Sequence, residues 1–292
     1  MAAKTFPVSV ISSRKSFHWG KFTSRFLIYF LLTLGLSITL LPFVMMILSS
    51  FKTNLEVLRV PPTFWPEKFT TENYIKIFTD PKLPLLRFYG NSAFVAIFNV
   101  ASTLFTSSLI GYMFAKFEFP GKKILLGWFL TMMMIPTQIT MIPSYLILAK
   151  LGLINSLWGL VILSAVDAFG IFMMRQFCET LPTELMDAAR IDGASEWQIY
   201  RRIVLPQLGA PLATLGILGF MHTWNAYLWP MIVLQKIEVR TLPIILTWFN
   251  STHTGQGALI MAATVMIIVP ILIVFMFFQR WIVQGFTMTG FK

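Results

Sequence analysis

An apolar run close to the start of the chain is the strongest constraint on what this sequence can fold into. From Phe26 to Phe51 there is no charged residue, and a membrane-spanning helix needs about 20 predominantly apolar residues. The run is too long for the apolar core of a signal peptide, and it lacks an obvious small-residue cleavage site. We therefore expect an uncleaved helix that crosses a membrane.

Composition extends this expectation to the whole chain, because 56% of the residues are hydrophobic and only 12% are charged. Soluble domains carry about 25% charged residues. Five further apolar segments follow the first, so we predict an all-α, polytopic membrane protein of six transmembrane helices in one domain, residues 1–292. The later spans are expected within Phe88–Ala115 and Ile124–Ala149, at about Leu157–Phe177, within Gly209–Leu234, and at about Ala258–Phe278.

The connections between these spans differ in length and charge. Residues 52–87 are expected to form an ordered extracytoplasmic loop, with a short helix around Glu72–Phe78. The apolar stretch Leu242–Trp248 is too short to span, which suggests a partly inserted segment. Of the 23 basic residues, 14 lie on the side that holds both termini and the polar loop 181–206. Because basic loops stay in the cytoplasm, we expect both termini there.

The polar loop 181–206 is predicted to fold as two short helices joined by a tight bend. Thr183 is a candidate N-cap for the first helix, whose first turn would hold Glu184 and Asp187. Gly193 can adopt the left-handed conformation that ends a helix. Ser195 and Gln198 have the spacing of a capping box, and Pro206 is expected to stop the second helix. From this pattern alone, a pair of amphipathic helices lying on the membrane surface is the favoured interpretation.

The same loop resembles the EAA signature, which permease subunits of ATP-binding-cassette (ABC) importers carry. That signature reads here as Asp187-Ala188-Ala189, Gly193 and Ile203-Val204-Leu205-Pro206, with the family spacing. Aspartate in place of glutamate at the first position keeps the charge and shortens the side chain. The continuation Ile191-Asp192-Gly193-Ala194-Ser195 resembles the carbohydrate-uptake, maltose-type branch of these importers.

The resemblance implies a type I ABC importer permease fold, in which the first short helix docks into an ATPase subunit. Its expected coupling residues are Glu184, Asp187, Ala188, Ala189, Asp192 and Gly193. Expected partners are a second homologous permease subunit, two ATPase subunits and an extracytoplasmic solute-binding protein, in the inner membrane of a bacterial cell. The chain itself is then not an enzyme and holds no cofactor, because ATP and magnesium bind the partner ATPase. The implied function is import of sugars or oligosaccharides by alternating access.

The residues themselves add one candidate for the substrate path. Trp224, Asn225 and Tyr227 cluster in the fifth span, where aromatic rings can stack on sugars and the amide can bond hydroxyls. If the helix is continuous, Trp224 and Tyr227 share a face with Leu228. The alternative is a belt of aromatic residues at the membrane interface.

Other chemistry is poorly supported by the sequence. No phosphate-binding loop is present, and the histidines lack metal-ligand spacing, so no metal site and no nucleic-acid partner are expected. The net charge of +11 is assigned to lipid contacts and topology. Asp167 and His222 lie within predicted spans with open roles. Alternative functions are an importer of a polyol or phosphorylated sugar, a stand-alone channel, and a membrane-embedded enzyme.

Overall fold

The computed structural model of the protein describes residues 19–252 and 255–288, and every regular element within these ranges is helical. The terminal segments that carry most of the basic arm and the C-terminal end lie outside the described residues. Three helices are long and apolar enough to cross a membrane alone. They are α1 (Trp19–Ser50), α4 (Leu85–Lys116) and α15 (Gly257–Met288). They confirm the first, second and sixth predicted spans.

The other three predicted spans are bent pairs of helices. The third is α5 (Lys122–Met134) with α6 (Thr137–Lys150), bent by 105°. The fourth is α7 (Leu157–Ser164) with α8 (Ala168–Thr180), bent by 43°. The fifth predicted span begins as α12 (Gly209–Trp224), which pairs with the segment Glu196–Gln207 of the preceding polar loop at a bend of 77°. Counting each pair as one span gives six within the described part of the chain.

The breaks in the third and fifth spans have local causes. Ile135 is extended, with φ −81° and ψ 119°, because a residue before proline is disfavoured in the helical region and Pro136 follows. In the fifth span, α12 ends at Trp224 and the short α13 (Leu228–Val233) follows. Tyr227 between them leaves the helical conformation, with φ −123° and ψ −60°, and Pro230 weakens the helix here because it has no N–H to donate to the carbonyl of Ala226. The prediction of one continuous helical face from Trp224 to Leu228 is therefore wrong.

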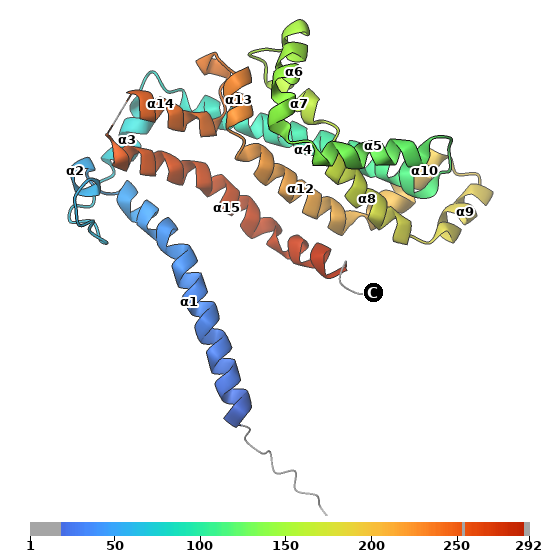
Figure 1. The fold of residues 1–292 in the computed structure, drawn as a ribbon, viewed down its shortest axis with the longest axis horizontal. Helices are drawn as coiled ribbons and strands as arrows, with labels where there is room; N and C mark the ends of the chain where they lie inside the picture. Colours follow the sequence, from blue (N-terminus) through green and yellow to red (C-terminus); the bar gives the residue numbers. More distant parts are fainter. Residues whose placement is uncertain (1–18, 253–254, 289–292) are drawn as a thin grey trace, which may run out of the picture.

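Helix α4 is the centre of the packing and contacts α7, α8 and α12, while α12 also packs on α15. These helices lie side by side in the body of the molecule (Figure 1). Two glycines allow the closest crossing, between α4 and α8. A Cβ on Gly111 would lie 2.6 Å from the Cβ of Met174, and one on Gly170 would lie 2.4 Å from the Oγ of Ser107. The backbones of α4 and α8 therefore lie so close together that only very small residues fit between them.

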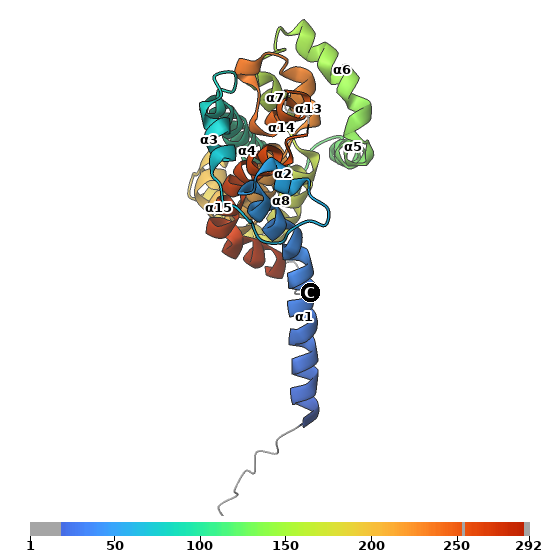
Figure 2. The same ribbon diagram turned by 90° about the vertical axis from the view of Figure 1, so that its left-hand side faces the viewer.

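Helix α1 projects away from this body in two perpendicular views (Figures 1 and 2). None of its apolar spanning window is buried inside the chain, although the helix does contact α15. A helix this apolar and this exposed has to be covered by lipid or by another membrane subunit.

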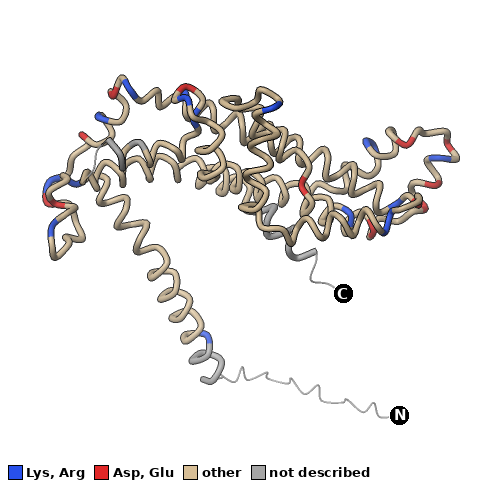
Figure 3. The backbone as a smooth tube through the Cα atoms, turned by 45° about the horizontal axis from the view of Figure 1, so that its top comes forward, with Lys and Arg blue, Asp and Glu red and all other residues tan. Residues whose placement is uncertain are grey.

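The loop 52–87 is ordered, as predicted, and holds α2 (Asn54–Val57) and α3 (Glu72–Thr79), the latter matching the expected short helix. The loop has a polar core. The buried Lys52 ammonium donates to the carbonyl and hydroxyl of Thr63, and the Thr63 hydroxyl donates to Glu56 at 2.8 Å. Charged residues gather at this end of the body and at the opposite end, with few between (Figure 3). This distribution fits a body that crosses a membrane end to end.

The short apolar stretch after residue 241 is inserted into the helical body. It forms the turn η3 (Leu242–Ile244) and then α14 (Ile245–Thr252). Leu242, Ile245 and Phe249 are buried and belong to one cluster with residues of α4, α12 and α15. The segment that the sequence predicts to be partly inserted is thus buried in the protein core of this chain.

Candidate functional site

The polar loop folds as two helices with a bend, as its sequence predicts. Helix α9 (Thr183–Ile191) leads to Gly193, whose φ of +81° is the left-handed conformation that glycine favours. Helix α10 (Glu196–Ile199) begins at Ser195, and both hydrogen bonds of the predicted capping box with Gln198 are present. The bend is therefore fixed by a glycine on one side and a capped helix on the other.

Two details of the prediction for this loop are wrong. Thr183 is the first residue of α9, and Pro182 occupies the capping position without a side-chain hydrogen bond. Pro206 does not end the second helix. The chain continues through a π-helical turn (η1, Tyr200–Val204) into α11 (Leu205–Gln207), where Pro206 is near the start. The helical run ends one residue after Pro206, at Gln207, and a 77° bend separates it from α12.

Arg190 holds the two short helices together. Its guanidinium donates to Asp187 at 2.6 Å on its own helix and to Glu196 at 2.7 and 3.3 Å on α10. The hydrogen bond from Arg190 lowers the pKa of the Glu196 carboxyl, and the same bond raises the pKa of Arg190. Both groups are therefore charged at neutral pH, and their ion pair connects α9 to α10.

This unit is attached to the C-terminal end of α4. The Tyr112 hydroxyl donates to Glu196 at 3.2 Å, and Ser108 and Tyr200 share a 2.8 Å hydrogen bond. The Lys116 ammonium donates to the Leu181 carbonyl at 2.5 Å. Tyr112, Ile199 and Tyr200 also belong to one buried cluster with Met186. These contacts connect α10 and the turn that follows it to the end of α4, and Met186 brings α9 into the same cluster.

The coupling residues that the sequence predicts lie mainly on the open side of α9. Glu184, Asp187, Ala188, Asp192 and Gly193 are exposed, and Ala189 is half-buried against the cluster beneath. Met186 is 1% exposed and anchors the helix from its other side. The small Ala188 next to exposed Leu185 gives a partner protein close access to the helix backbone.

Cys178, the one cysteine of the sequence, is fully buried in α8 beneath this loop. We expect a membrane-impermeant maleimide to leave the folded native chain unlabelled from either side. The native chain then gives no labelling background, so single cysteines can be introduced at exposed positions and labelled selectively. Asp192→Cys is expected to react only from the cytoplasmic side, and Leu58→Cys in the 52–87 loop only from outside. Labelling of Asp192→Cys in intact cells would contradict the six-span topology.

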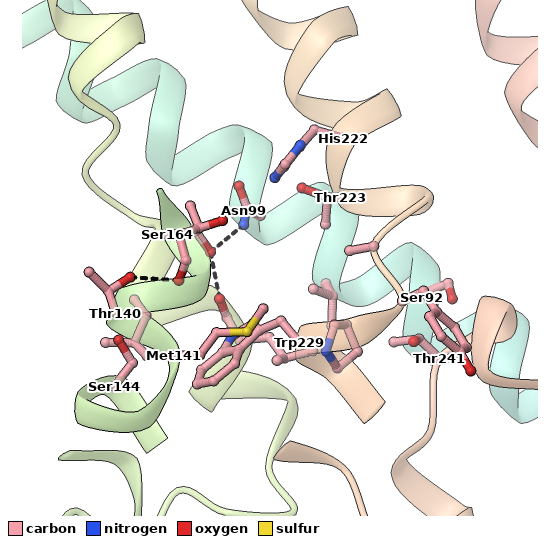
Figure 4. A pocket seen from close by; sticks show the side chains of 17 residues that line it. Ser92, Asn99, Thr140, Met141, Ser144, Ser164, His222, Thr223, Trp229 and Thr241 are labelled. Atoms are coloured by element: carbon pink, nitrogen blue, oxygen red, sulfur yellow. Dashed lines mark hydrogen bonds between the residues drawn. The ribbon is translucent and has the colours of Figure 1, made fainter. Parts of the chain in front are cut away.

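A second candidate site is a cavity of about 350 Å³ in the middle of the helical body. Its walls come from α4, α6, α7 and the chain between α12 and η3 (Figure 4). Polar side chains from three of these walls point into one space, among them Asn99, Thr140 and Ser164. Asn99 donates to the Ser164 hydroxyl at 2.6 Å, which connects α4 to α7.

The three predicted substrate-path residues are not brought together at this cavity. Tyr227 lines it, as does His222, whose role the sequence left open. Trp224 is 5% exposed, belongs to the apolar core, and donates its indole N–H to the Ile267 carbonyl at 3.1 Å. Asn225 is exposed, outside the cavity lining, and donates to the Met221 carbonyl at 2.9 Å. Trp224 thus presents no free ring face for a sugar in this chain.

This placement changes the expected behaviour of a Trp224 variant. Trp224→Phe removes the indole donor to the Ile267 carbonyl, at a cost of about 1 kcal/mol. We expect a lower thermal unfolding midpoint of the subunit in detergent, with no selective change in cargo preference. Trp128→Phe is the matched control, since Trp128 is 65% exposed on α5. A Trp224→Phe subunit of unchanged stability but altered cargo preference would restore the original prediction.

Asp167, the other residue of open role, caps a helix. It is the N-cap of α8 at the bend after α7 and accepts the Gly170 N–H at 2.8 Å. Other residues of the two sites went unpredicted, notably Tyr112, Asn99 and Thr241. A usable signal was present in the second span, where small polar residues recur at helical spacing. They are Ser92, Asn99, Thr103 and Ser107, all buried.

Comparison with known proteins shows the family to which this chain belongs. Residues 107–288, more than half of the chain, match the family described as "Binding-protein-dependent transport system inner membrane component". The chain belongs to this family. It is therefore a non-catalytic inner-membrane component of an ABC transport system that works with a solute-binding protein.

Two curated relatives cover nearly the whole chain. The arabinooligosaccharides transport system permease protein AraQ of Halalkalibacterium halodurans is 37% identical over 90% of this chain and 96% of its own length. The lactose transport system permease protein LacG of Rhizobium radiobacter is 33% identical over 88% of this chain and 93% of its own.

A solved structure supports the fold independently. One chain of a bacterial ABC transporter that imports the acidic polysaccharide alginate superposes with a TM-score of 0.78. It is 24% identical, and the match covers 91% of this chain and 98% of that chain. The predicted type I ABC importer permease fold is thereby confirmed.

Proposed function

We propose that this chain is the permease subunit of an ATP-driven importer for sugars or oligosaccharides. The observation that carries the proposal is the α9–α10 unit, an exposed two-helix surface attached to the central helix α4 through Glu196 and Tyr112. A channel or a membrane enzyme has no use for such a docking surface. The names of the two relatives, which transport arabinooligosaccharides and lactose, support a saccharide cargo.

The partners follow from what the chain lacks by itself. ATP and magnesium would bind two ATPase subunits, with one coupling loop docked on each. A second, homologous permease subunit would carry the other loop, and the exposed apolar surface of α1 supports such a neighbour. The loop 52–87 and the solute-binding protein would then face outward, with the α9–α10 unit and both termini in the cytoplasm. ATPase closure would push on α9, tilt α4, and alternate access to the path.

The test is purification of the tagged chain from its native membrane, followed by reconstitution into liposomes. We expect a second permease and an ATPase to co-purify, and ATP-dependent uptake of an arabinooligosaccharide or lactose when the solute-binding protein is present. Uptake without ATP, or a complex that lacks an ATPase, would contradict the proposal. ATP-dependent uptake of a polyol or phosphorylated sugar alone would keep the importer and overturn the saccharide cargo.

A further inference from the structure

Thr241 leaves a hydroxyl without a partner in the wall of the central cavity. The residue is 5% exposed, and its Oγ1 is buried with no hydrogen-bond partner among the described residues. A threonine just before a helix usually caps it. Here the second residue of η3 is Pro243, which has no N–H, and the Ile244 N–H donates to the Thr241 carbonyl at 3.2 Å, so the hydroxyl caps neither. The Leu242 N–H donates to the Ser92 hydroxyl of α4 at 2.7 Å. An unpaired buried hydroxyl is costly, so a ligand that bonds it is stabilised.

The backbone on which Thr241 sits is held in place from two sides. Asn91 of α4 donates to the carbonyls of Glu238 and Arg240 at 3.0 and 2.9 Å. Further back, the Asn155 side chain between α6 and α7 accepts the N–H groups at positions 235 and 236, at 2.7 and 2.8 Å. The segment that carries the hydroxyl is therefore fixed before any ligand binds, which reduces the entropy cost of binding.

The other groups around the cavity are uncharged donors, acceptors and rings. Hydroxyls come from serines and threonines of α4, α6 and α7, an amide from Asn99, and aromatic rings from Tyr227 and Trp229. Hydroxyls and amides both donate and accept, which suits a ligand with many hydroxyls. Within the described lining, His222 is the single residue that can carry a positive charge. A carboxylate or phosphate would lose its hydration on entering this cavity, and the lining offers few positive charges to replace that hydration.

We infer that this cavity binds an uncharged glycosyl unit of the cargo, with the Thr241 hydroxyl and the Tyr227 ring among its contacts. The inference rests on the proposed function and narrows it. It places a cargo site within this subunit and favours neutral over acidic or phosphorylated saccharides. It also replaces Trp224 and Asn225 by residues that line the cavity.

The first measurement is concentration-dependent uptake by the reconstituted complex. Thr241→Val keeps the shape and removes the hydroxyl, and we expect the concentration for half-maximal uptake of an arabinooligosaccharide or lactose to rise about fivefold. Thr241→Ser restores a hydroxyl and is expected to recover most of the wild-type affinity. Thr264→Val is the matched control, because Thr264 bonds the Ile260 carbonyl within α15 and lies outside the lining. An unchanged value for Thr241→Val would overturn the assignment.

The second measurement does not depend on transport. Ser144 lines the cavity from α6, and the buried native Cys178 gives no background, so Ser144→Cys introduces one reactive thiol. We expect millimolar neutral saccharide to slow its alkylation in the assembled complex, and an oligouronate of equal length to leave the rate unchanged. Equal protection by both would overturn the preference for uncharged cargo, and protection by neither would overturn the site. If Thr241→Val fails to assemble, the Ser144→Cys protection experiment still tests the site.

The wild-type complex separates failure of this inference from failure of the proposed function. If it shows no ATP-dependent uptake of any saccharide, the proposed function is wrong and the inference falls with it. If wild-type uptake is normal while Thr241→Val behaves as wild type and Ser144→Cys is not protected, the importer stands and the cargo site lies elsewhere.

Discussion

Gly111→Ala is expected to destabilise the folded subunit strongly. The added Cβ would lie 2.6 Å from the Met174 Cβ and 2.8 Å from the backbone nitrogen of Arg175. The backbone of α8 cannot rotate away as a flexible side chain would, so α4 and α8 have to separate. Overpacking of this kind costs about 1–3 kcal/mol and sometimes more. The measurement is the yield and thermal midpoint of detergent-extracted subunit, both of which should fall sharply.

The matched control lies on the same helix. A Cβ on Gly90 meets nothing within 4 Å, and alanine is the better helix former by about 1 kcal/mol. Gly90→Ala should therefore extract at least as well as the wild type. If Gly111→Ala gave the same yield and midpoint as Gly90→Ala, the tight α4–α8 crossing would be wrong.

The local chemistry of the coupling loop was readable from sequence, because its signals act over short distances. Gly193 acts through its own backbone, Ser195 and Gln198 are three residues apart, and all behave as predicted. The spans were readable for a similar reason, since a bilayer demands long apolar helices. The pattern did not predict the break after Trp224. There α12 ends, although the nearest following proline, Pro230, is six residues further along the chain.

The cavity depends on contacts between distant parts of the chain. Ser92 bonds the Leu242 N–H across 150 residues, and Trp224 is held by the carbonyl of Ile267, 43 residues away. No local spacing encodes which of two neighbouring polar residues faces a cavity and which faces the core. The sequence pattern therefore could not indicate that Trp224 belongs to the apolar core while Thr241 lines the cavity.

Ala188→Trp is expected to abolish coupled transport while leaving the subunit folded and inserted. Ala188 is exposed on α9, so the larger side chain meets nothing within this chain. It would hold a docking ATPase away from the helix, and an interface penalty of about 1–3 kcal/mol weakens association about fivefold to more than a hundredfold. We expect the ATPase to be lost during purification and ATP-dependent uptake to fall by at least about tenfold. The measurement combines ATPase recovery with uptake per assembled complex.

Two controls separate docking from general effects of bulk at the α9 surface. Ala188→Ser keeps a small side chain at the same place and should retain both ATPase recovery and uptake. Leu58→Trp adds the same bulk at a 58% exposed position of the 52–87 loop, at the other end of the molecule, and should retain the ATPase. If Ala188→Trp retained the ATPase and lost uptake, the helix would transmit motion without being the contact itself. Full uptake by Ala188→Trp would contradict the docking role of α9, because no partner could then approach the helix as closely as the alanine allows.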